Sequence, residues 1–215
     1  MEVGADHAGL MLADFLRKQQ GLTGTKIVCA EGDCGACSVL KRAPGEEYYT
    51  PFNSCIMPVA LVDGWSLVTV EGLAAQDGAL SPEQKAMREC HGSQCGFCTP
   101  GFVVTLAGLT EKRRACGQSE PITPESAKNA LTGNLCRCTG YEPILKAAVS
   151  MTAAVEPLAK RYSSSAQEAE IKRALKQDVV MDSDSFRFAA PRTLRAASDI
   201  LSGGARSKDG GVRLI

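Results

Sequence analysis

Apolar and polar residues alternate in short segments over the first 75 positions, with one helical stretch among them. Between Leu10 and Gln19 apolar residues recur at helical spacing and Gly21 follows, which predicts a short amphipathic helix ended by glycine. The pattern then predicts strands over 38–40, 48–52 (broken at Pro51) and 65–70, with turns at 44–45 and 63–64, the second of hairpin type. Residues 1–10 are expected to form the end of a strand and a turn. Residues 1–75 therefore indicate an α+β module.

Helical patterns replace the strands from about residue 81. The segment Ser81-Pro82-Glu83-Gln84 combines an N-cap serine, a proline at the first helical position and a glutamine at the third, which predicts a helix to about Cys90. Further helices are expected from Thr99-Pro100, from Thr123-Pro124 to near Gly133, and over 142–155. Four short helices with tight connections predict a small bundle over residues 76–156.

The last third of the chain is polar and then apolar again. Residues 157–184 carry a serine run and many charges, which predicts a surface linker with transient helical structure. Residues 185–215 resume with Phe186-Arg187-Phe188 and a short helical pattern, and end in a glycine-rich stretch. Some thirty residues cannot form an independent core, so this tail must dock on something or stay mobile.

Composition and charge exclude several classes of protein. The 24 basic and 24 acidic residues give a net charge of zero, and aromatic residues make up 5%. This predicts neither a nucleic-acid partner nor a polybasic membrane surface. There is no apolar run of the roughly 18 residues that a membrane span needs, and no signal peptide at the start. The chain has ten cysteines, and six of them stand in C-x2-C or C-x-C pairs, which are typical of metal ligands rather than disulfides, so we expect a cytoplasmic protein.

The first group of cysteines has the spacing of an iron–sulfur site. Cys29, Cys34 and Cys37 follow the pattern C-x4-C-x2-C, and Cys55 comes after seventeen further residues. This is the plant-type ligand pattern for a [2Fe–2S] cluster. Three thiolates in one loop need backbone that turns sharply, which the glycines at 32 and 35 provide.

A second group joins one C-x2-C pair to one C-x-C pair. Cys95 and Cys98 are separated from Cys136 and Cys138 by 37 residues, and each pair lies at the end of an expected helix. Helices that return antiparallel would bring the pairs together around a second [2Fe–2S] cluster. A structural zinc site is the alternative, although a zinc ribbon normally uses C-x2-C twice. Of the two remaining cysteines, we expect Cys90 to be a buried structural residue and Cys116 to be exposed.

Four motifs, in order, resemble the iron–sulfur part of the molybdenum hydroxylases. They are G-T-K at 24–26, C-A-E-G-D-C-G-A-C at 29–37, H-G-S-Q-C-G-F-C-T-P-G-F at 91–102 and G-N-L-C-R-C-T-G-Y at 133–141. The similarity covers roughly residues 10–155. Within the family, T-V-E-G-L at 69–73 and the lead-in at 91–94 look most like the small subunit of the bacterial xanthine dehydrogenases.

The resemblance implies a fold and two cluster sites. It implies a plant-type, ferredoxin-like β-grasp domain over 1–75, followed by a four-helix [2Fe–2S]-binding domain over 76–156. The first four cysteines would bind the cluster nearer the flavin, and the second four the cluster nearer the molybdenum cofactor. Gln94 matches the glutamine that contacts the pterin of that cofactor in the family; the alternative is a surface amide.

The resemblance also implies partners and a role. The chain would relay electrons from a molybdopterin-binding large subunit, through two clusters, to FAD and then NAD. Residues 185–215 resemble the start of the family's FAD domain, but Gly203-Gly204-Ala205-Arg206 does not reproduce its flavin-phosphate motif. We therefore expect an incomplete FAD-binding domain and a chain truncated within it, with a late start at Met1. Another hydroxylase of the family, acting on aldehydes, carbon monoxide or nicotinate, a free ferredoxin-like carrier and a zinc-stabilised interaction module remain alternatives.

Overall fold

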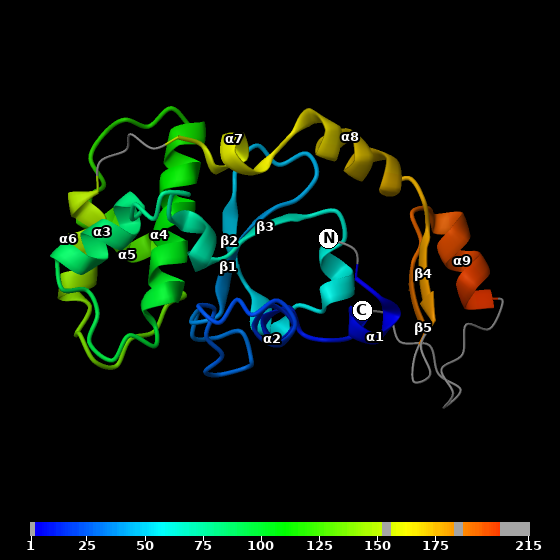
Figure 1. Ribbon diagram of the computed structural model, residues 1–215, viewed down its shortest axis with the longest axis horizontal. Helices are drawn as coiled ribbons and strands as arrows, with labels where there is room; N and C mark the ends of the chain where they lie inside the picture. The colour runs from blue at the N-terminus through cyan, green and yellow to red at the C-terminus, as the bar shows by residue number, and fades with distance from the viewer. Residues whose placement is uncertain (1–2, 152–155, 183–186, 203–215) are drawn as a thin grey trace.

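A three-stranded antiparallel sheet and a long helix, α4, form the centre of the fold (Figure 1). The computed structural model describes residues 3–151, 156–182 and 187–202. The sheet has the order β2-β1-β3, and both outer strands run antiparallel to β1. Its strands are β1 (Ser38–Arg42), β2 (Thr50–Asn53) and β3 (Ser66–Val68).

The two faces of β1 are buried against different helices. Val39 packs with Leu12 and Phe15 of α2 (Leu12–Lys18), which confirms the amphipathic helix expected there. Its neighbour Leu40 belongs to a second cluster, to which α4 (Thr99–Ala115) contributes Phe102, Val103, Val104, Leu106 and Ala107. Successive side chains of a strand point to opposite faces, so this one central strand joins two cores.

Several expectations for the first module were wrong in detail. Residues Ala5–Ala8 form a short helix, α1, rather than the end of a strand. β2 continues through Pro51, opposite Leu40, because an edge strand tolerates a residue without an N–H. The turn at 63–64 does not join a hairpin: it links a 3-10 helix, η2 (Val59–Val62), to β3, whose partner is β1. The remaining 3-10 helices are η1 (Ser54–Ile56) and η3 (Val70–Leu73), and η3 takes up part of the expected third strand.

The four helices of the second module are present. They are α3 (Pro82–Glu89), α4, α5 (Pro124–Ala130) and α6 (Glu142–Ser150). The capping box of α3 is confirmed: Gln84 N–H donates to Ser81 Oγ (3.3 Å), and Ser81 N–H donates to Gln84 Oε1 (2.9 Å). α6 ends at Ser150, and the remainder of the expected helix, 152–155, lies outside the described residues.

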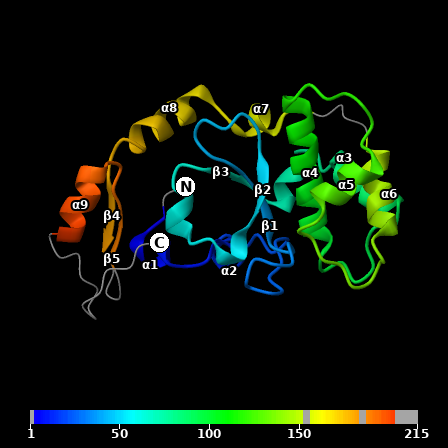
Figure 2. The same cartoon turned by 180° about the vertical axis from the view of Figure 1, so that it is seen from behind.

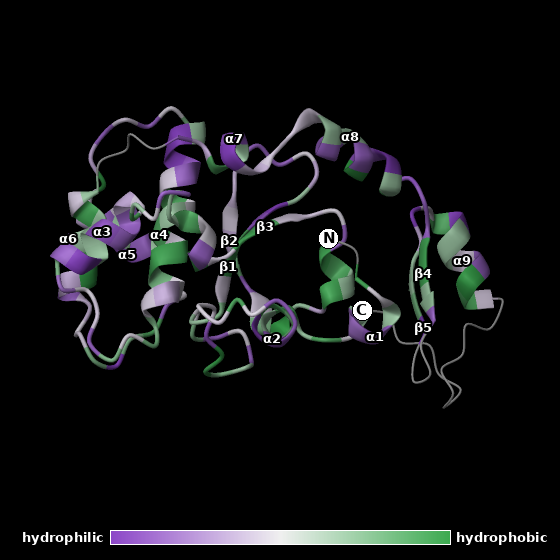
Figure 3. Ribbon diagram, in the orientation of Figure 1, coloured by the Kyte–Doolittle hydropathy of each residue, from purple (hydrophilic) through white to green (hydrophobic). Residues whose placement is uncertain are grey.

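α4 lies between the sheet and the helices α3, α5 and α6 in both views (Figures 1 and 2). Phe102 and Leu106 are completely buried in one core together with Leu40, Tyr49 and Ile144. Figure 3 shows that the middle of α4 is apolar, whereas its last turn, with three basic residues, is hydrophilic. Sheet and helices therefore share a core and hold each other in place.

The segment after residue 156 is not a bare linker. It forms α7 (Leu158–Tyr162), α8 (Ser165–Ala174), the hairpin β4 (Val179–Asp182) with β5 (Arg187–Ala190), and α9 (Leu194–Ser202). Arg161 donates to the carbonyls of Gly72, Leu73 and Ala74 at 3.2–3.3 Å. The expected helical structure is thus present but anchored on the first module. Phe186 and the glycine-rich stretch at 203–206 lie outside the described residues.

Candidate functional site

The first cysteine group lies in the loop before β1 and in η1. Cys34, Cys37 and Cys55 are buried, and Cys29 is half-buried. The thiols lie in two neighbouring pairs: the Cys34 N–H is 3.5 Å from Cys29 Sγ, and the Cys55 thiol adjoins that of Cys37. The fold therefore brings together all four sulfurs that the spacing predicted, and the fourth comes from η1, which directly follows β2.

Backbone geometry makes this loop possible. Gly32 and Gly35 have φ values of +82° and +67°, in the left-handed region that glycine tolerates best. A Cβ on Gly32 would lie 2.7 Å from Ile56 Cδ1, so the loop closes tightly over η1. Ser54 Oγ donates to the Cys37 carbonyl (2.6 Å), which ties η1 to the loop.

The second group lies at the N-terminus of α4. Cys98 is the N-cap residue of α4, while Cys136 and Cys138 follow α5 in a loop. Cys138 Sγ lies 3.5 Å from Cys95 Sγ, and Cys98 is hydrogen-bonded to Cys136. The two pairs that the sequence placed 37 residues apart meet as expected.

Two residues of the second loop support its sulfurs and were not singled out from the sequence. Thr139 contacts Cys136 Sγ through its hydroxyl (3.2 Å) and its N–H (3.5 Å). Tyr141, held at a φ of +70°, accepts the Cys136 N–H at its hydroxyl (2.9 Å). Both belong to the G-N-L-C-R-C-T-G-Y motif, so their position beside the ligands was the available signal.

Thiol pKa values in the first group diverge within the loop. The Glu31 N–H, followed by the Cys34 N–H, lowers the pKa of Cys29 to about 6. Burial, followed by the bond to Cys37, raises the pKa of Cys55 to about 12. Burial likewise raises the pKa of Cys34. The loop N–H groups thus stabilise negative charge on sulfur, which is the form that binds metal.

The second group shows the same division. Burial raises the pKa of Cys98 to about 12. Burial also opposes ionisation of Cys136, but the Thr139 hydroxyl and N–H outweigh it and lower the pKa of Cys136 to about 7. The Phe97 N–H lowers the pKa of Cys95, whereas the bond to Cys95 raises that of Cys138.

The four sulfurs of each group match the number of protein ligands that either a [2Fe–2S] cluster or a structural zinc ion takes. Across the described residues, no three His, Cys, Asp or Glu side chains are grouped to hold one metal ion. A mononuclear zinc site needs four ligands around one point. A [2Fe–2S] cluster divides four protein ligands as two on each iron. Each group of four sulfurs could supply two ligands to each iron of such a cluster.

Three other residues were singled out from the sequence. Gln94 is exposed and directly precedes Cys95. Cys90 is half-buried and packs against the core with Sγ 3.8 Å from Ser150 Oγ, so it is less buried than expected. Cys116 is exposed at the end of α4, as expected.

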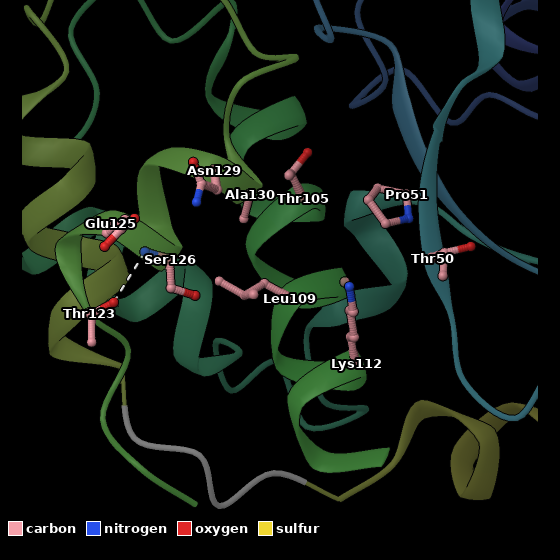
Figure 4. A pocket seen from close by; sticks show the side chains of 11 residues that line it. Thr50, Pro51, Thr105, Leu109, Lys112, Thr123, Glu125, Ser126, Asn129 and Ala130 are labelled. Atoms are coloured by element: carbon pink, nitrogen blue, oxygen red, sulfur yellow. Dashed lines mark hydrogen bonds between the residues drawn. The ribbon is translucent and has the colours of Figure 1, made fainter. Parts of the chain in front are cut away.

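A cleft of about 530 Å³ lies away from both cysteine groups, between β2 and the helices α4 and α5 (Figure 4). Pro51, Lys112 and Glu125 are among its lining residues, and none of the lining residues is a cysteine or histidine. The Ser126 N–H donates to Thr123 Oγ1 (3.1 Å) at its rim. The cleft offers no redox chemistry.

Membrane insertion through a helix finds no support in this structure. Among the helices that the structure describes, none combines the length and the apolar character needed to cross a bilayer.

Comparison with known families identifies the class of the second module. The family described as "[2Fe-2S] binding domain" matches residues 69–149, which run from the end of β3 through α6. This part of the chain is thus a [2Fe–2S]-binding domain.

Relatives and solved structures then identify the larger family. Quinoline 2-oxidoreductase from Pseudomonas putida 86 has a chain 34% identical, with a TM-score of 0.57, and the match covers 77% of this chain and 86% of that one. The aldehyde oxidoreductase of Desulfovibrio gigas is also 34% identical, with a TM-score of 0.57 over 80% of this chain and 17% of that one. The xanthine dehydrogenase of Blastobotrys adeninivorans is 48% identical over 141 residues, which are 64% of this chain and 10% of that protein. The chain belongs to the molybdenum hydroxylase family, as an iron–sulfur component of an oxidoreductase.

The curated relatives are much longer than this chain. It spans about a tenth of the length of the xanthine dehydrogenases and aldehyde oxidases that it matches.

Proposed function

We propose that this chain is the electron-transfer part of a xanthine dehydrogenase. Electrons from the oxidation of hypoxanthine or xanthine to urate, at a molybdenum cofactor on a partner chain, pass through it toward FAD and NAD. The observation that carries this proposal is the convergence of two separate groups of four sulfurs, each divided into two pairs. The free state of all ten cysteines supports a reducing, cytoplasmic location.

Each group of sulfurs would hold one [2Fe–2S] cluster. The ligands of the cluster nearer the flavin would be Cys29, Cys34, Cys37 and Cys55, and those of the cluster nearer molybdenum Cys95, Cys98, Cys136 and Cys138. When bound, the two clusters supply one-electron carriers between a two-electron oxidation and a two-electron acceptor. The exposed Gln94 would contact the pterin of the molybdenum cofactor.

The chain itself orients and tunes these ligands. N–H groups of the first loop and the Thr139 hydroxyl bond to sulfur, and such bonds stabilise the thiolate and shift the potential of a bound cluster. Burial of Cys34, Cys37 and Cys55 keeps water from the first site. No residue of this chain is assigned acid–base chemistry.

The proposed domains follow the two sites. Residues 1–75 would be the ferredoxin-type β-grasp domain and 76–156 the four-helix [2Fe–2S]-binding domain. Residues 157–184 would connect them to the beginning of an FAD-binding domain at 185–215. The shared core around α4 supports treating the first two domains as one relay unit.

Xanthine is one of two substrate classes that the relatives favour. The aldehyde oxidase 4 of Cavia porcellus is 40% identical over 136 residues, close to the values for several xanthine dehydrogenases. An aldehyde-oxidising enzyme is therefore the second candidate, and the partner chain decides between them.

Purification of a tagged chain from its native cells tests the proposal. We expect a molybdopterin-containing chain to co-purify, and anaerobic xanthine to reduce two distinct iron–sulfur EPR signals. Reduction by an aldehyde but not by xanthine would favour the second candidate. Absence of any molybdenum-containing partner would contradict both.

A further inference from the structure

The two cysteine groups meet at two consecutive peptides of the first loop, Cys34–Gly35 and Gly35–Ala36. The Cys34 carbonyl accepts the backbone N–H of Leu135 (3.0 Å). The Gly35 carbonyl accepts the side-chain Nδ2 of Asn134 (3.1 Å). Asn134 and Leu135 directly precede Cys136, so the loop of the first group is bonded to the segment that carries the second.

Close backbone contact reinforces these hydrogen bonds. Gly101 lies in the first turn of α4, three residues after Cys98, and a Cβ there would overlap the Gly35 carbonyl oxygen. A Cβ on Gly35 would in turn lie 2.6 Å from Asn134 Nδ2. Gly101 has an ordinary helical conformation, so the residue is needed there for space and not for its dihedral angles.

The bond from Asn134 is not needed to satisfy the Gly35 carbonyl. Within the first loop, Ser38 already donates to that oxygen through Oγ (2.7 Å) and N–H (3.2 Å). Asn134 is nevertheless only 4% exposed and directs its amide across the boundary between the modules. Its role is therefore to fix the relative position of two segments, because it joins residues that are 99 positions apart in the sequence.

We propose that Asn134 is a positioning residue of the relay. Together with the space left by Gly101, it holds the Gly35–Ala36 peptide at a set offset from Cys136, and so sets the separation of the two clusters. This inference rests on the proposed function. It matters because electron transfer between two carriers slows steeply as their separation grows.

Matched substitutions in the full chain test this role. Gly101→Ala places a methyl group against the Gly35 carbonyl, and Asn134→Ala removes the side-chain hydrogen bond to it. Neither substitution replaces a cysteine. Gly133→Ala is the control for the first, because a Cβ at that position meets nothing within 4 Å. Asn129→Ala, at an exposed asparagine of α5, is the control for the second. Each chain is reconstituted anaerobically with iron and sulfide, then reduced and titrated.

The readouts are the EPR signal and midpoint potential of the first cluster, and the magnetic interaction between the two. We expect Gly101→Ala and Asn134→Ala to shift the first-cluster signal and change the interaction, although both residues lie in the second module. The two controls should match the unsubstituted chain. Where Gly101→Ala does not fold, Asn134→Asp, which keeps the shape but loses the donor, takes its place.

Two results would count against this role and can be told apart. If the altered chains lose only thermal stability while the first-cluster signal, its potential and the interaction stay unchanged, Asn134 is merely structural and the inference is wrong. If the unsubstituted chain itself binds a single cluster, the proposed function fails and the inference falls with it.

Discussion

The two cysteine groups differ in how far the chain itself encloses them. In the first, Cys37 is 2% exposed and packs with Cys55 and Ala13. In the second, Cys95 and Cys138 are exposed, and the neighbouring side chains of Phe97 and Leu135 are about half exposed. One site is closed by its own loop and η1, whereas the other faces outward with apolar side chains beside it.

This difference indicates where partners are needed. A cluster open to water has a different potential and lifetime from one that is buried. Exposed apolar side chains around an open site are typical of surfaces that a partner covers. We infer that the second group depends on a molybdopterin-containing partner for its final environment, and the first much less so.

The largest contrast is expected when one ligand of each group is replaced by serine. Cys37→Ser buries a hydroxyl in an apolar cluster, which should lower the free energy of unfolding of the metal-free chain by about 1–3 kcal/mol. Cys138→Ser lies at the surface and should change it by less than about 0.5 kcal/mol. Denaturant unfolding measures both values, and equal destabilisation would contradict the contrast.

The same pair of variants tests whether the groups are independent. Each substitution should abolish one EPR signal of the reconstituted chain and leave the other. Loss of both signals in Cys138→Ser would show that the second group is required for the first to form.

Binding of a partner should depend on the apolar side chains beside the open site. Phe97→Ser should keep both EPR signals and the stability of the chain, but weaken binding to the molybdopterin-containing chain by about 2 kcal/mol, roughly thirtyfold in Kd. Val180→Ser, at a similarly exposed residue of β4, is the control. Equal affinities of the two variants, measured by calorimetry, would show that Phe97 lies outside the interface.

Thiol reactivity in the metal-free chain should vary with pH according to position. Cys29, with a pKa of about 6, is already mostly thiolate at pH 7, so its alkylation rate should rise less than about twofold between pH 7 and 9. An ordinary thiol, with a pKa of about 8.5, should become roughly twentyfold more reactive over that range. Cys55, with a pKa of about 12, should stay protonated and slow throughout. Mass spectrometry of each labelled cysteine checks the order, and a steep rise at Cys29 would contradict it.

The smallest effect is expected at Gln94. Its side chain is exposed, so Gln94→Ala should change the free energy of unfolding by less than about 0.5 kcal/mol and leave both EPR signals in place. Gln118→Ala, at another exposed glutamine, is the control. A change in the molybdenum EPR signal of the complex with Gln94→Ala alone would support the pterin contact, and identical spectra for both variants would argue against it.

Local spacing allowed much of this molecule to be predicted. The four helices of the second module and the capping box at Ser81 depend on residues close in sequence, and the structure confirms them. The grouping of cysteines into two sets also followed from spacing. Strand limits were predicted less accurately. β2 continues through Pro51 because it is an edge strand, and η3 begins at Val70, where the third strand was expected to continue.

Contacts between distant segments could not be predicted from the sequence. Nothing in the spacing indicates that Cys34 shares a hydrogen bond with Leu135, or that Gly101 lies against Gly35. The docking of α7 was missed because Arg161 bonds to backbone carbonyls, which carry no residue-specific signal. Such contacts arise only once the sheet and α4 share a core.

The iron content of the anaerobically reconstituted full chain tests the central claim most directly. Two [2Fe–2S] sites predict about four iron and four sulfide per chain, with two distinct EPR signals on reduction. About two iron per chain, or zinc bound in place of iron at the second group, would contradict it.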